Sequence, residues 1–302
     1  MNEELDDERT EADEAPGDAR VGSADEEFRR ACMEAARRAL DEDLRSTGDI
    51  TSRALFTEDE TCAGVFTLKE DGIVAGLPLA QAVFKLLSEE VEFTPRVPEG
   101  QAAVAGSVLA MIKGPVIPIL EGERTALNFL QRLSGIATLT AQYVRVAGRY
   151  GVRIKDTRKT TPGLRLLEKY AVRVGGGLNH RMGLFDAILI KDNHVQAAGG
   201  VGNAVRAVRS EVGPDFPVEV EVEDLAGLAE AIEAGADTVM LDNMAVTEMA
   251  RAVELAADRA KLEASGGINL TTLEEIAATG VDFISAGALT HSCRALDISL
   301  DL

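Results

Sequence analysis

The sequence predicts an α/β protein in which a (β/α) barrel follows a smaller α+β domain with an open sheet. From residue 152 onward, short apolar strands alternate with helical stretches, a pattern typical of a parallel sheet with buried strands. Polar or charged residues follow nearly every strand, which favours a barrel, because an open doubly wound sheet gathers them at one switch point. The 302 residues, 46% of them hydrophobic, are enough for a barrel and a smaller companion domain.

The N-terminal part of the chain predicts a tail followed by a small domain. Residues 1–24 are strongly acidic and lack aromatic side chains, so we expect a disordered, self-repelling acidic tail. Helical periodicity runs from Phe28 to Leu40. Residues 61–112 contain short β-like runs and one helical segment, PLAQAVFKLLSE, which predicts an open sheet with helices. We assign residues 25–127 to this N-terminal domain.

A long helical pattern, ERTALNFLQRLSGIATLTAQYVRVAGRY, leads into the barrel, which we place at residues 128–292. Because Pro115 and Pro118 precede this pattern, Arg124 is expected near a helix N-terminus, where it would reinforce an anion-binding spot. The barrel strands are expected at VRI, AILI, VEVEV, TVML, LEA and FISAG. Residues 293–302 are expected to return to the N-terminal domain.

The charge distribution singles out one stretch of the chain. The formal net charge is -20, yet residues 155–194 hold eight Lys or Arg against four Asp or Glu, with two of the three histidines. A basic island in an acidic protein indicates a site for small, highly charged anions. Nucleic acid is disfavoured, because the net charge would repel it and there is no Trp and only three Tyr for stacking. The acidity itself fits either a salt-adapted surface or the steering of cations.

The sequence also bears on the cellular compartment. It has no run of 18 apolar residues and no secretory signal pattern, so we expect neither a membrane span nor export. The three cysteines, Cys32, Cys62 and Cys293, lie far apart without metal-ligand spacing. We therefore expect free thiols in a reducing cytoplasm.

Cationic residues cluster after the first two barrel strands. KDTRKT carries Arg158 and Lys159, NHR carries His180 and Arg181, and Lys191 follows AILI. Arginine pairs bidentately with a carboxylate, whereas lysine offers a compact charge suited to phosphate. The arginines and the histidine therefore suit a small dicarboxylate, and the two lysines suit a diphosphate.

Two acidic residues end the next two strands. Glu221 ends VEVEV and Asp242 ends TVML, so their side chains are expected to meet across the barrel mouth. Proteins typically hold Mg²⁺ by one or two carboxylates plus substrate phosphates, so this pair is a candidate site for Mg²⁺ and ribose hydroxyls. A pair of glycosidase carboxylates is a rival interpretation, but it leaves the cations unexplained. Glu219 and Glu223 share the face of Glu221 and are candidates to bind nearby cations.

Glycine-rich loops follow the last two strands. SGGIN and SAGALTHS open short helical stretches at the positions where (β/α) barrels usually hold a phosphate on backbone N–H groups. The two loops are therefore candidates to hold a phosphate. His291, which follows, is a candidate to hydrogen-bond that phosphate, or else a helix-capping or buried histidine.

Together these motifs resemble one known family. The matching segments are ERT at 123–125, KDTRKTTPGLR at 155–165, GGGLNHRMGLFDAILIKDNH at 175–194, EVEVE at 219–223, LDNM at 241–244, EASGGIN at 263–269 and SAGALTHS at 285–292. They are similar to nicotinate-nucleotide pyrophosphorylase (carboxylating), also called quinolinate phosphoribosyltransferase. The resemblance starts near Phe28 and implies an N-terminal α/β open sandwich beside an incomplete (β/α) barrel. It implies the conversion of quinolinate and phosphoribosyl diphosphate to nicotinate mononucleotide, CO₂ and diphosphate, with Mg²⁺, in de novo NAD biosynthesis.

The resemblance also implies how the substrates are held. Arg158, His180 and Arg181 would hold the quinolinate carboxylates. The phosphate would be held by Ser265, Gly266, Gly267, Gly287 and His291. The family works as a homodimer with shared active sites, so Arg124 would reach in from the partner subunit. Whether dimers assemble further into hexamers stays open.

Four residues would carry the catalytic roles by the same resemblance. Lys159 and Lys191 would face the diphosphate or the carboxylates, and Glu221 and Asp242 would face the ribose hydroxyls and Mg²⁺. No covalent nucleophile is evident in the sequence, which agrees with catalysis by positioning and electrostatics.

Two alternatives remain at this level. A close relative acting on a different pyridine or acid, such as the molybdenum-transport-associated homologue, would share the motifs. A catalytically silent sensor of quinolinate would share the fold, but the presence of Lys159, Glu221 and Asp242 disfavours it.

Overall fold

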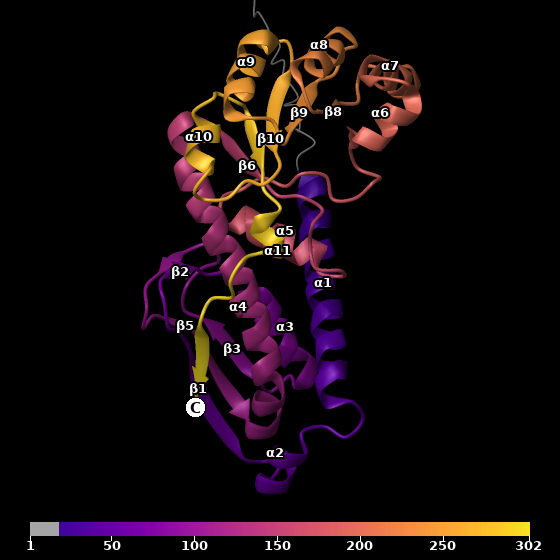
Figure 1. The fold of residues 1–302 in the computed structure, drawn as a ribbon. Helices are drawn as coiled ribbons and strands as arrows, with labels where there is room; N and C mark the ends of the chain where they lie inside the picture. The colour runs from indigo at the N-terminus through magenta and orange to yellow at the C-terminus, as the bar shows by residue number, and fades with distance from the viewer. Residues whose placement is uncertain (1–17) are drawn as a thin grey trace, which may run out of the picture.

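The computed structural model describes residues 18–302, which form two regions joined by one long helix (Figure 1). The N-terminal region is built on an antiparallel sheet, and the C-terminal region is built on a six-stranded parallel sheet. This mixed α/β architecture confirms the predicted fold class. Among the described residues, no helix combines the length and the apolar character needed to cross a membrane.

The N-terminal sheet has four strands in the order β12-β1-β5-β3. Their bounds are β1 Thr61–Leu68, β3 Glu92–Pro95, β5 Val108–Pro115 and β12 Ile298–Asp301. A separate two-stranded antiparallel sheet pairs β2 Gly72–Ile73 with β4 Ala102–Ala103. Along β1, buried and more exposed residues alternate, because one sheet face packs on the core. Phe66, Phe84 and Phe93 meet in that core with ring centroids 5.5 to 6.1 Å apart.

Helix α3 Leu77–Leu87 contacts this sheet, and α1 Asp18–Leu44 packs against α3. The short helix α2 Ile50–Leu55 lies between α1 and β1 in the chain. α1 also contacts α5 Arg165–Val174 of the C-terminal region. It begins at Asp18, inside the segment predicted as a tail, so the predicted boundary at residue 24 falls within a helix. Residues 1–17 lie outside the described part of the chain.

The long helix α4, Val116–Ala147, runs from the N-terminal sheet to the barrel (Figure 1) and ends in the single 3-10 turn η1, Gly148–Tyr150. It begins earlier than predicted, because Pro118 lies in its first turn, where a proline removes no intrahelical hydrogen bond. Arg124 therefore lies in the third turn rather than at the helix N-terminus, and the dipole argument for it was wrong. The predicted domain boundary at residue 127 also falls within this helix.

The C-terminal region contains all six predicted barrel strands, which are mutually parallel in the order β6-β11-β10-β9-β8-β7. Their bounds are β6 Arg153–Lys155, β7 Ile188–Ile190, β8 Val218–Val222, β9 Thr238–Asp242, β10 Lys261–Ser265 and β11 Phe283–Ser285. The helices around them are α5, α6 Asp192–Ala198, α7 Val201–Val212, α8 Leu225–Glu233, α9 Val246–Ala256, α10 Leu273–Ala277 and α11 Ala288–His291. β6 and β7 are the two edges of this sheet, so the barrel is incomplete.

The segment after α5 lies along the open edge of the barrel. Leu178 forms an isolated parallel bridge with Lys155 of β6, and its backbone N–H donates to the carbonyl of Ile154. This places His180 and Arg181 beside the gap between β6 and β7. At the other end of the chain, β12 pairs antiparallel with β1, which is the return to the N-terminal domain expected for residues 293–302.

Candidate active site

A cavity of about 380 Å³ lies at the carboxyl ends of the barrel strands, and residues at or after all six strands line it. The lining residues are Thr157, Arg158, Lys159, His180, Arg181, Leu189, Lys191, Glu221, Met240, Asp242, Asn243, Ser265, Gly266, Gly267 and Ser285. This end of a barrel is where parallel strands direct their loops, and it is where (β/α) barrels carry their active sites.

The cationic wall of the cavity contains two guanidinium groups. Arg158 buries its Nε without a hydrogen-bond partner among the described residues, so this donor is available to an anionic ligand. Burial, and then repulsion from Arg158, lowers the pKa of the Arg181 guanidinium. Arg165 holds both segments, because it donates to the carbonyls of Arg158 at 3.3 Å and Met182 at 3.2 Å. Two cations held this close favour a ligand with two negative charges.

The acidic wall faces these cations. Lys191 Nζ donates to Glu221 Oε2 at 2.6 Å. Asp242 accepts from the amide of Asn243 at 2.8 Å. Asn243 itself has a left-handed backbone with φ of 53°, and its N–H donates to the carbonyl of Ser265 at 2.9 Å. This ties the end of β9 to the glycine-rich loop after β10.

The glycine-rich loops line a smaller adjoining cavity of about 130 Å³. Gly287 and His291 lie there, beside Lys159 and the Ser265–Gly267 loop. Gly266 has φ of 100°, and a side chain on it would collide with Asn243. Glycine at this position therefore keeps the loop backbone, with its N–H groups, close to the end of β9.

A buried ion pair supports the loop that carries His180. Asp156 and Lys169 are both fully buried and form an ion pair. Asp156 also accepts from the His180 N–H at 2.8 Å, and Lys169 donates to the His180 carbonyl at 2.9 Å. Burial raises the pKa of Asp156 and lowers that of Lys169, while their mutual attraction opposes both shifts. The pair thereby fixes the main chain of His180 from both sides.

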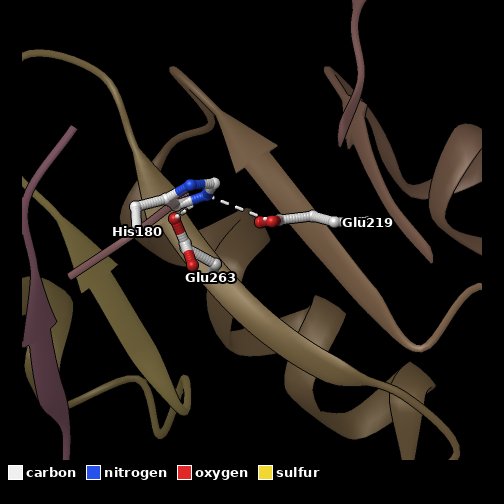
Figure 2. A group of neighbouring side chains, drawn as sticks. All are labelled: His180, Glu219 and Glu263. Carbon is white, nitrogen blue, oxygen red and sulfur yellow. Dashed lines mark ion pairs between the residues drawn. The ribbon is translucent and has the colours of Figure 1, made fainter. Parts of the chain in front are cut away.

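His180, which lines the larger cavity, lies beside two glutamates, Glu219 and Glu263, that line neither cavity (Figure 2). His180 Nε2 lies 3.1 Å from Glu219 Oε2 and 3.5 Å from Glu263 Oε1, without a well-aligned hydrogen bond to either. The other ring nitrogen, Nδ1, accepts the backbone N–H of Arg181 at 2.7 Å. Lys155 Nζ binds the second oxygen of Glu263 at 2.5 Å. Both ring nitrogens of His180 therefore face groups of the protein itself.

Of the residues expected from the sequence, ten line the larger cavity, and Gly287 and His291 line the adjoining one. Arg124 lies outside both cavities, on an exposed turn of α4. Sequence reasoning missed Glu263, which lies behind His180, and Lys155, which forms an ion pair with Glu263, and it gave Glu219 no definite role. The available signal was the acidic residue in the middle of the apolar strand LEA. A carboxylate buried at such a position needs a basic or hydrogen-bonding partner beside it.

The fold and the cavity define a class: a (β/α)-barrel enzyme that binds small, multiply charged anions at the carboxyl ends of its strands. Residues 136–301 match the family described as quinolinate phosphoribosyl transferase, C-terminal domain, and residues 49–134 match its N-terminal domain. The chain belongs to the quinolinate phosphoribosyltransferase family.

Named relatives and solved structures agree with this assignment. The chain is 46% identical over 256 residues to a probable nicotinate-nucleotide pyrophosphorylase [carboxylating] of Bacillus subtilis, covering 85% of this chain and 88% of that one. It is 43% identical over 279 residues to the nicotinate-nucleotide pyrophosphorylase [carboxylating] of Mycobacterium leprae, covering 90% and 97%. The structure of the nicotinate-nucleotide pyrophosphorylase from Francisella tularensis superimposes with a TM-score of 0.86 at 42% identity, covering 90% and 96%.

Proposed function

We propose that this protein is a quinolinate phosphoribosyltransferase of de novo NAD biosynthesis. It converts quinolinate and phosphoribosyl diphosphate to nicotinate mononucleotide, CO₂ and diphosphate. The observation that carries this proposal is a single cavity that joins two guanidinium groups, two lysines, two carboxylates and a glycine-rich loop. Binding this pair of substrates requires such a combination of charges. One substrate is a dicarboxylate, and the other is a phosphorylated sugar with a diphosphate leaving group.

The cations are divided between the two substrates. Arg158 and Arg181 bind the carboxylates of quinolinate, because a guanidinium pairs bidentately with a carboxylate and Arg158 has an unpartnered buried Nε. Lys159 and Lys191 face the diphosphate, and Ser265 with the loops after β10 and β11 binds the 5′-phosphate. His180 accepts the backbone N–H of Arg181, and His291 lines the adjoining cavity.

The reaction then needs positioning and charge stabilisation rather than a covalent intermediate. The C1–O bond to diphosphate breaks with oxocarbenium character at C1, and the lysines stabilise the leaving group while the pyridine nitrogen attacks C1. The new bond makes the ring cationic. That charge stabilises the electron pair left at C2 when the C2 carboxylate departs as CO₂. A proton then adds to C2 in place of the lost carboxylate. The arginines orient the ring throughout.

Mg²⁺ is the cofactor that fits the acidic wall. Glu221 and Asp242 are oxygen donors on neighbouring strands that line the same cavity. Magnesium is usually bound by one or two carboxylates together with substrate phosphates, and this donor set suits it. A bound Mg²⁺ would neutralise charge on the diphosphate, and the same two carboxylates would orient the ribose hydroxyls.

The quaternary structure and the compartment are part of the same proposal. Arg124 is exposed and lies outside both cavities of its own chain, so we propose a homodimer in which it completes the partner's site. We also propose that the enzyme works in the cytoplasm, where Cys32, Cys62 and Cys293, all free in this structure, stay reduced.

A direct assay tests the reaction. Purified protein is incubated with phosphoribosyl diphosphate, Mg²⁺ and quinolinate, and nicotinate mononucleotide, CO₂ and diphosphate are quantified. Equimolar products, lost with EDTA and restored by added Mg²⁺, are expected. Binding of quinolinate without turnover would indicate a sensor instead. Turnover of another pyridine acid, with quinolinate inert, would indicate a relative with a different substrate.

A further inference from the structure

The hydrogen-bond partners of His180 define which ring nitrogen carries its proton. Its Nδ1 faces the backbone N–H of Arg181 at 2.7 Å, and a backbone N–H can only donate. Nδ1 must therefore present a lone pair. The ring hydrogen is then on Nε2, which faces the carboxylates of Glu219 and Glu263 at 3.1 and 3.5 Å. Carboxylates are acceptors, so the assignment is consistent at both nitrogens.

The same cluster has the residue types of a metal site, because His180, Glu219 and Glu263 bring three ligand atoms within 4.8 Å of one another. A metal would occupy the Nε2 lone pair and leave the hydrogen on Nδ1. That hydrogen would point at the Arg181 N–H, so two donors would face each other. Lys155 already binds one oxygen of Glu263 and neutralises its charge. The geometry favours a proton on Nε2 over a metal ion.

Burial makes this arrangement costly to disturb. Glu263 is fully buried, and Glu219 and His180 are each nearly so at their side chains. Burial, and then repulsion from Glu219, raises the pKa of Glu263, and Lys155 and His180 oppose that shift. Nε2 lies within 3.1 to 3.5 Å of both carboxylates (Figure 2), so a hydrogen on it reduces their mutual repulsion. The ring thus faces two glutamates on one side, and on its other side Nδ1 accepts the Arg181 N–H.

We propose that Glu219 and Glu263 are positioning residues for the dicarboxylate substrate, acting through His180. They hold its ring as the Nε2–H tautomer, the ring's Nδ1 holds the main chain of Arg181, and Arg181 binds the substrate carboxylate. His180 thus acts by placing Arg181, not by donating a ring N–H to the carboxylate. This inference rests on the proposed function, because it takes quinolinate as the ligand of Arg181.

Two substitutions of His180 separate these roles. In His180→Asn, the side-chain oxygen replaces Nδ1 and still accepts the Arg181 N–H. In His180→Gln, the side-chain amide replaces Nε2 and loses that acceptor. We expect the KM for quinolinate to rise about 10- to 100-fold in the Gln variant and clearly less in the Asn variant, with the KM for phosphoribosyl diphosphate unchanged in both. Equal losses, or better function of the Gln variant, would overturn the proposal.

Variants of Glu219 test the contact between a carboxylate and the Nε2 side of the His180 ring. Glu219→Gln keeps an oxygen acceptor for Nε2–H, whereas Glu219→Leu removes it, so the Leu variant should show the larger rise in the KM for quinolinate. Glu223→Leu is the matched control, because Glu223 lies four residues further along the chain, just beyond the end of β8, and is exposed. An equal effect of Glu219→Gln and Glu219→Leu, or an effect of Glu223→Leu as large as that of Glu219→Leu, would contradict a positioning role.

Nitrogen NMR reads the tautomer without turnover. The chain has three histidines, and the signals of His180 are those that disappear in His180→Asn. We expect a protonated Nε2 and an unprotonated Nδ1 in the wild-type protein, because the Arg181 N–H requires a lone pair on Nδ1. A protonated Nδ1, or a stoichiometric shift of the His180 signals on adding Zn²⁺ or Mn²⁺, would refute the proposal. Absence of quinolinate turnover would instead refute the proposed function, and the NMR result would still stand.

Discussion

At the scale of single residues, Gly266 shows how backbone conformation shapes the phosphate loop. Its φ of 100° is a region that residues with side chains rarely adopt, and a Cβ there would collide with Asn243. Gly266→Ala should therefore displace the loop after β10 and raise the KM for phosphoribosyl diphosphate about 10-fold or more. Initial-rate kinetics with each substrate varied in turn measure this effect, and the KM for quinolinate should change little.

The neighbouring glycine is the matched control for this prediction. Gly267 has φ of 60°, the ordinary left-handed region, and a Cβ on it would meet nothing within 4 Å. Gly267→Ala should therefore have the weaker effect. An equal or larger effect of Gly267→Ala would show that contact with the ligand, rather than the collision with Asn243, decides this loop.

The sequence predicted the charged residues of the cavity better than their supports. Arg158, Lys159 and Arg181 were expected because cations that follow strands of a parallel sheet converge at one edge. Glu263 was not expected, because an acid inside a strand does not reveal which basic group it faces. Only the folded arrangement shows Lys155 on one of its oxygens and His180 near the other.

At the scale of elements, the start of α3 depends on a carboxylate from outside the helix. Glu99 accepts the backbone N–H groups of Gly76 at 3.0 Å and Leu77 at 2.5 Å, and the hydroxyl of Tyr170 at 3.0 Å. Burial raises the pKa of Glu99 above its ordinary value of 4.5, although these hydrogen bonds oppose the shift. The folded protein therefore holds the Glu99 proton more tightly than the unfolded chain does.

The raised pKa of Glu99 determines how the stability of the folded protein changes with pH. As pH rises above 4.5, ionisation of Glu99 favours the unfolded chain until the pH exceeds the folded-state pKa. Glu99→Gln does not titrate and keeps an oxygen acceptor for α3. The melting temperature of this variant minus that of the wild type should therefore increase as the pH is raised above 4.5. A relative melting temperature that falls over this range, or an equal trend in the exposed Glu92→Gln control, would contradict the account.

Whether the sequence predicted an element depended on how clearly the hydrophobic pattern of that element could be recognised. All six barrel strands were expected, because short apolar runs that alternate with helical stretches have a distinct period. The two-residue strand β4, Ala102–Ala103, is too short to show any period. The start of α4 was placed too late, because Pro118 was interpreted as a break although a proline is tolerated in the first turn.

At the scale of the whole molecule, the proposed homodimer predicts that two inactive variants can complement each other. Arg124→Ala and Arg181→Ala should each be nearly inactive, since each leaves a substrate carboxylate without its charged partner. If Arg124 acts in the partner's site, a mixed dimer has one site with both lesions and one intact site. Mixing the variants under conditions of subunit exchange should then restore roughly a quarter of wild-type activity.

This complementation experiment needs evidence of exchange, which differently tagged subunits recovered in one complex provide. If Arg124 serves its own barrel, every site in the mixture keeps one lesion and no activity returns. No recovery after verified exchange would refute the shared site while leaving the family assignment unaffected.

The measurement that tests the central claim most directly compares quinolinate with nicotinate, which lacks the carboxylate at C2. Two guanidinium groups line the cavity, and a site built for two carboxylates leaves one half-buried cation unpaired when nicotinate is bound. We predict that kcat/KM with phosphoribosyl diphosphate and Mg²⁺ is about 10⁴-fold or more higher for quinolinate than for nicotinate. Comparable values for the two acids would contradict the claim that this cavity is built for quinolinate.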